Sequence, residues 1–228
     1  MRKLYVVPII HTSADLGTLA PAIDNTSRER LGEDLWVRHK RTVDGFWYSV
    51  AIFFSMLMVV DFKIYQDGLI ADGEMGMRIV TQGVCDGSKN YEIIAELLEN
   101  GAELVRTEDL TLVKREYDLL SRVIKANSMA ERVSAAVEFK SVAKDLLSQR
   151  DSFIAQRIDQ TLADGETGSL FIGAYHDVIT RLLRDIIIKE VKETAQVREY
   201  HAMLTYLGRD DRRFQQLSEY LVEPPLLD

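Results

Sequence analysis

The chain has 228 residues, of which 46% are hydrophobic and 28% charged, an ordinary composition for a folded domain. Its formal net charge of −8 argues against a nucleic-acid partner, which normally requires a basic surface. The single cysteine, Cys85, excludes an intrachain disulfide and a four-cysteine zinc site. A lone thiol is typical of a reducing compartment, so we expect a cytoplasmic protein.

Four short apolar segments predict β-strands that are buried on both faces, because they are rich in branched and aromatic side chains. In chain order these are residues 3–10, 62–66, 102–106 and 169–173.

The segments between these strands are mostly typical of helix. The expected helices cover residues 16–23, 26–58 with a break near 43–45, 88–100, 110–126, 129–163 as one or two helices, 177–206 and 209–221. Ser88 is an expected N-cap. Residues 68–87 contain five glycines and are expected to be mainly loop, with a short strand or helix near residues 77–81.

Strands that alternate with helices predict an α/β fold. We expect a mainly parallel sheet of at least four strands with helices packed around it, followed by C-terminal helices. The expected organisation is an α/β domain over residues 1–208 and a C-terminal helix and tail over 209–228.

The most apolar segment, FWYSVAIFFSMLMVV, covers residues 46–60. It is shorter than the roughly 20 apolar residues that span a membrane, so no membrane span is expected. Two interpretations remain open. The segment is either a core helix that runs into a strand, or the surface of a homo-oligomer. In the second case its contact residues would be Trp47, Phe53, Phe54 and Met56.

Polar side chains follow each predicted strand. Because parallel strands end at one edge of the sheet, where α/β folds bind their ligands, these side chains are expected to converge. The candidate catalytic residues are His11, His176, Asp67 and Glu108, and the candidate ligand- or cofactor-binding residues are Tyr65 and Tyr175.

Two kinds of chemistry fit this set. His11, His176 and Asp67 would be ligands of a divalent metal such as Mn, Co or Zn, which would activate a water molecule. Without a metal, the two imidazoles would be general acid–base groups. The structural alternatives are that Asp67 belongs to an Asp-Gly turn and that Glu108 and Asp109 cap the following helix.

The C-terminal segments RDSFIAQRI, which begins at Arg150 and Asp151, and SLFIGAYH resemble the TraB/Tiki superfamily. There an R-D-x-x-[MI]-A helix precedes a strand that ends in G-x-x-H, matched here by residues 173–176. The first strand keeps the family's histidine as His11 but has Pro8 in place of glycine. The second-strand carboxylate of the family would correspond to Asp67.

The superfamily includes Tiki-type metal-dependent proteases, erythromycin-esterase-like enzymes and ChaN-like haem-binding proteins. The resemblance therefore implies an α/β sheet with a histidine-lined cleft. We expect a metal-assisted hydrolase whose cleft takes a small-molecule or peptide ligand. The alternative is a non-catalytic module that binds a small ligand or haem in this cleft and forms a homo-oligomer through residues 46–60.

Overall fold

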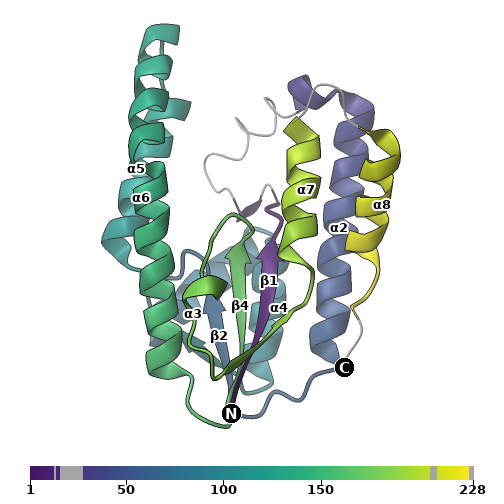
Figure 1. The fold of residues 1–228 in the computed structure, drawn as a ribbon, viewed down its shortest axis with the longest axis vertical. Coiled ribbons are helices and arrows are strands. Elements are labelled where there is room, and N and C mark those ends of the chain that lie inside the picture. The colour runs from purple at the N-terminus through teal and green to yellow at the C-terminus, as the bar shows by residue number, and fades with distance from the viewer. Residues whose placement is uncertain (13, 16–27, 206–209, 226–228) are drawn as a thin grey trace.

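The computed structural model describes the whole chain except residues 13, 16–27, 206–209 and 226–228. The short helix predicted over 16–23 lies outside the described residues. The described part contains a five-stranded parallel sheet in the order β3-β2-β4-β1-β5 (Figure 1). The strands are β1 (Arg2–Ile9), β2 (Phe62–Gln66), β3 (Glu103–Val105), β4 (Thr167–Gly173) and β5 (Ile186–Glu190). The predicted α/β class is confirmed.

The helices cover both faces of this sheet (Figure 1). They are α2 (Glu33–Ser55), α3 (Gly73–Cys85), α4 (Lys89–Glu99), α5 (Leu110–Ile124), α6 (Met129–Thr161), the 3-10 helix η2 (Ile179–Arg181), α7 (Thr194–Thr205) and α8 (Asp211–Val222). Alternation along β1 divides the core, because successive side chains of a strand point to opposite faces. Tyr5 and Val7 pack with α2, α4, α7 and α8, whereas Leu4 and Val6 pack with α6.

The predicted helix over 177–206 is wrong, because this segment contains η2, β5 and α7. The apolar residues of the segment fit a helical period, but Ile186, Ile187 and Ile188 are consecutive and β-branched, which favours a strand. β5 pairs with β1 at one edge of the sheet. β5 brings the sheet to five strands, in agreement with the expected sheet of at least four.

Two further predictions, both based on glycine as a helix breaker, differ from the structure. Residues 73–85 form α3, which is longer than the short element expected near 77–81, and α2 continues unbroken through Gly45. At Gly45 an added Cβ would lie 2.5 Å from Cγ1 of Val222, and at Gly83 it would lie 2.2 Å from the ring of Tyr91. These glycines permit close packing between neighbouring elements and do not interrupt their helices.

Residues 46–55 lie in α2 and residues 56–60 form the loop that leads to β2. Trp47, Phe53 and Phe54 are buried in the core of their own chain, so they are not the contact surface that the oligomer hypothesis named. Met56 is exposed. Within the described residues, no helix is sufficiently long and apolar to cross a membrane.

Candidate functional site

Three predicted site residues come together at the carboxyl edge of the sheet. Asp67 follows β2, Glu108 follows β3 and His176 follows β4. Helix α6 passes this edge and adds two buried residues, Arg150 and Asp151. We call these five residues the strand-end cluster.

Arg150 connects the acidic members of this cluster. Its Nη2 donates to Oδ1 of Asp67 at 2.5 Å and also to Glu108, and its Nε lies 3.1 Å from Oε1 of Glu108. Nη1 donates to Glu116 of α5. One guanidinium therefore donates to three carboxylates, and these bonds hold Asp67 and Glu108 in place. If all three carboxylates are ionised, their negative charge exceeds the single positive charge of Arg150.

His176 is held at one ring nitrogen. Its Nδ1 lies 2.6 Å from Oδ1 of Asp151, and the other oxygen of Asp151 accepts the backbone N–H of Asp177 at 2.9 Å. Nε2 lies 3.5 Å from Oδ2 of Asp67, too far for a good hydrogen bond. Asp151 therefore orients the imidazole, and Nε2 is the nitrogen left to exchange a proton.

The electrostatics of the cluster favour a protonated imidazole. Burial lowers the pKa of His176, but the hydrogen bond to Asp151 and the charge of Asp67 outweigh it, so this pKa lies above its usual value. Burial raises the pKa of Asp67, but the positive charges of His176, Arg150 and His11 and the N–H of Gly173 bring it down to about 2. Asp67 is thus a fixed negative charge beside the imidazole.

Glu108 behaves differently from Asp67. Its side chain is fully buried, and burial raises its pKa to about 7 although Arg150 opposes the shift. The predicted helix cap is Asp109 and not Glu108, because the Asp109 carboxylate accepts from the backbone N–H of Thr111 and Leu112. Glu108 can therefore change protonation near neutral pH, beside an imidazole whose own pKa is raised.

The predicted metal set does not fit these contacts. His11 is exposed at the end of β1, near enough for its charge to influence Asp67. Asp67 already accepts from Arg150 at one oxygen and from the N–H of Gly173 at the other. In the described part of the chain, no three His, Cys, Asp or Glu side chains are grouped so that they could hold a metal ion. The positive charges beside Asp67 are those of the Arg150 guanidinium and the His176 imidazole.

The two predicted tyrosines lie in different surroundings. Tyr65 points to the α6 face, where it is fully buried and its hydroxyl lies 2.9 Å from that of Thr161, so it belongs to the core. Burial raises its pKa to about 12. Tyr175 is 60% exposed, and its ring stacks on His201 of α7. Only Tyr175 remains a candidate for contact with a ligand.

Arg198 of α7 supports the loop that carries His176. Its Nη2 donates to the carbonyl oxygen of His176 at 2.9 Å, and its Nε donates to that of Ala174. Sequence reasoning gave no role to Arg198, because nothing local marks a contact across 22 residues. Arg150 and Asp151 appeared only within the family resemblance.

No family model, curated protein or solved structure matches this chain significantly.

Proposed function

We propose that the protein is a hydrolase in which His176 is the general acid–base group, in place of the metal-assisted mechanism expected from the sequence. The observation that carries this proposal is the 2.6 Å contact between Nδ1 of His176 and Asp151. A carboxylate at this position fixes the tautomer of an imidazole and stabilises the imidazolium that forms during the reaction.

The proposed step uses the nitrogen that faces Asp67. In its neutral form, His176 accepts a proton at Nε2 from a water molecule as the oxygen attacks the substrate carbonyl. The same nitrogen then returns this proton to the leaving group as the bond to the carbonyl carbon breaks. Asp67 and Asp151 stabilise the imidazolium between these events, and Arg150 holds Asp67 in place.

The test is a hydrolysis screen with p-nitrophenyl esters, a lactone and a casein peptide mixture. His176→Gln should lower kcat/KM by at least about 100-fold, the range for loss of a general base, while the circular dichroism spectrum is unchanged. His39→Gln is the matched control, because His39 lies in α2 and contacts Tyr200 rather than the strand-end cluster. It should leave the rate unchanged.

Three outcomes would count against this proposal. Equal hydrolysis by the wild type and His176→Gln would remove the imidazole from the mechanism. Hydrolysis that is lost on dialysis against EDTA and restored by Mn, Co or Zn would favour the metal-assisted alternative. No hydrolysis of any of these substrates would move support to a non-catalytic ligand- or haem-binding module.

A further inference from the structure

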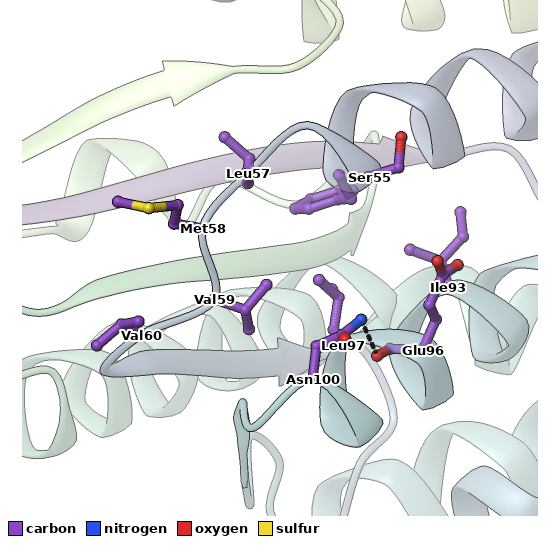
Figure 2. A pocket seen from close by; sticks show the side chains of 10 residues that line it. Ser55, Leu57, Met58, Val59, Val60, Ile93, Glu96, Leu97 and Asn100 are labelled. Carbon is purple, nitrogen blue, oxygen red and sulfur yellow. Dashed lines mark hydrogen bonds between the residues drawn. The ribbon is translucent and has the colours of Figure 1, made fainter.

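A cavity of about 360 Å³ lies between the 56–60 loop and α4. This loop precedes β2, so the cavity is at the amino edge of the sheet, opposite the strand-end cluster. Its walls are mainly apolar, and Figure 2 shows the side chains that form them. They include Leu57 and Val59 from the loop and Ile93 and Leu97 from α4. A cavity of this size can hold one large apolar side chain.

The loop beside this cavity presents apolar side chains to solvent. Met58 is 87% exposed, Val60 is 72% exposed and Met56 is 49% exposed. Adjacent exposed apolar residues typically mark an interaction surface. Methionine is unbranched and adapts to partners of different shape, so this loop can close around an inserted group.

The charge around the cavity is negative. Helices α2 and α4 both end here, and neither has a basic residue in its last turn to offset the negative end of its dipole. Glu96 lines the cavity, and Glu99 and Asp61 flank its lining residues. Among the described residues, none of these three carboxylates forms an ion pair. An apolar cavity with one unpaired acid in its lining and two beside it in the sequence favours a cationic partner.

From these features we infer that the cavity and the 56–60 loop form a docking surface for a basic amphipathic helix of a partner protein. One large apolar side chain of that helix enters the cavity, and flanking lysines or arginines pair with Glu96, Glu99 and Asp61. A second copy of this chain is a poorer occupant, because a symmetric contact would bring the same acids of both copies together.

The test uses a fluorescein-labelled helical peptide of leucine and lysine with one central tryptophan. Fluorescence anisotropy should give saturable binding that weakens at high salt. Glu96→Lys should weaken peptide binding by about tenfold or more, because it repels the lysines of the peptide. Met58→Asp should weaken binding by a similar factor, because it replaces an apolar contact with a carboxylate that loses its hydration against the leucines.

The matched controls are Met129→Asp and Asp44→Lys, which make the same charge changes at exposed positions away from the cavity. They should bind like the wild type. Peptide binding that is equal in Met58→Asp and Met129→Asp, or no binding at all, would overturn the inference. So would light scattering that shows a wild-type dimer dissociated by Met58→Asp, because the surface would then join two copies.

Discussion

The backbone N–H of Gly173 donates to Oδ2 of Asp67 at 3.1 Å, and the same oxygen lies 3.5 Å from Nε2 of His176. The end of β4 thus positions the carboxylate that follows β2. A side chain at residue 173 would crowd this contact. An added Cβ would lie 3.2 Å from Oδ2 of Asp67 and 3.4 Å from Cδ2 of His176.

Gly173→Ala should therefore separate Asp67 from His176. As the carboxylate moves away, the pKa of His176 should fall, since the charge of Asp67 helps to raise it. The expected loss of stability is about 1 kcal/mol, as for slight overpacking. Histidine C–H chemical shifts in an NMR titration give the pKa, and urea unfolding gives the stability.

Gly168→Ala is the matched control for this prediction. It adds a methyl group to the same strand, 3.2 Å from both the carbonyl oxygen of Lys63 and the ring of Tyr65. It should cost similar stability and leave the pKa of His176 unchanged. An equal change of this pKa in both variants would show that the effect is not local to Asp67.

Asp151→Asn should lower the pKa of His176 below its wild-type value, because the substitution removes the charged acceptor at Nδ1. If His176 is the general acid–base group, kcat should fall by roughly 100- to 10,000-fold, as in catalytic triads that lose this carboxylate. Asp145→Asn, at an exposed position of the same helix, is the control. An unchanged pH profile in Asp151→Asn would mean that this carboxylate has only a structural role.

The sheet could be predicted from sequence where its strands are buried on both faces. β1, β2 and β4 lie within two residues of their predicted bounds, since short segments rich in β-branched and aromatic residues favour such strands. The edge strand β5 was missed, because it is partly exposed and its pattern also fits a helix. Whether a segment forms helix, strand or loop is hardest to predict from sequence where tertiary contacts decide it, as they do at Gly45 in α2.

The candidate site could be predicted in part for a related reason. Because parallel strands end at one edge of the sheet, their order brings the residues that follow β2, β3 and β4 close together, as found for Asp67, Glu108 and His176. This rule does not give the direction of a side chain, so it placed Tyr65 at the site although this residue faces α6. Nor does it reveal Arg150, whose place depends on how α6 crosses the sheet.

Arg198→Met should loosen the loop that carries His176, because the loop loses its contacts with two carbonyl oxygens. We expect kcat to fall by about tenfold, the range for loss of a supporting contact, with KM changing less. Stability should change by about 1 kcal/mol or less, since Arg198 is exposed.

Arg198→Lys is the matched conservative variant, because the lysine ammonium can reach one of the carbonyl oxygens of Ala174 and His176. It should recover part of the rate lost in Arg198→Met. If both variants lose stability and rate in parallel, Arg198 supports the fold as a whole and does not position His176.

The protonation of Glu108 should make stability depend on pH. Its pKa rises from 4.5 to about 7 on folding, so the folded state binds a proton more tightly than the unfolded state. The resulting stabilisation is complete below about pH 4.5 and is lost as the pH rises through about 7. The free energy of unfolding of the wild type should therefore fall between about pH 5 and about pH 8 relative to that of Glu108→Gln.

The glutamine variant isolates this effect, because its amide oxygen can still accept from Arg150 but does not titrate. His176 contributes a slope of the same sign through its raised pKa, and this slope remains in both proteins. Glu116→Gln, at the partly exposed end of the Arg150 network, should keep the wild-type slope. Urea unfolding at the two pH values measures the difference. If the free energy of unfolding changes equally with pH in the wild type and in Glu108→Gln, Arg150 keeps Glu108 ionised throughout this range.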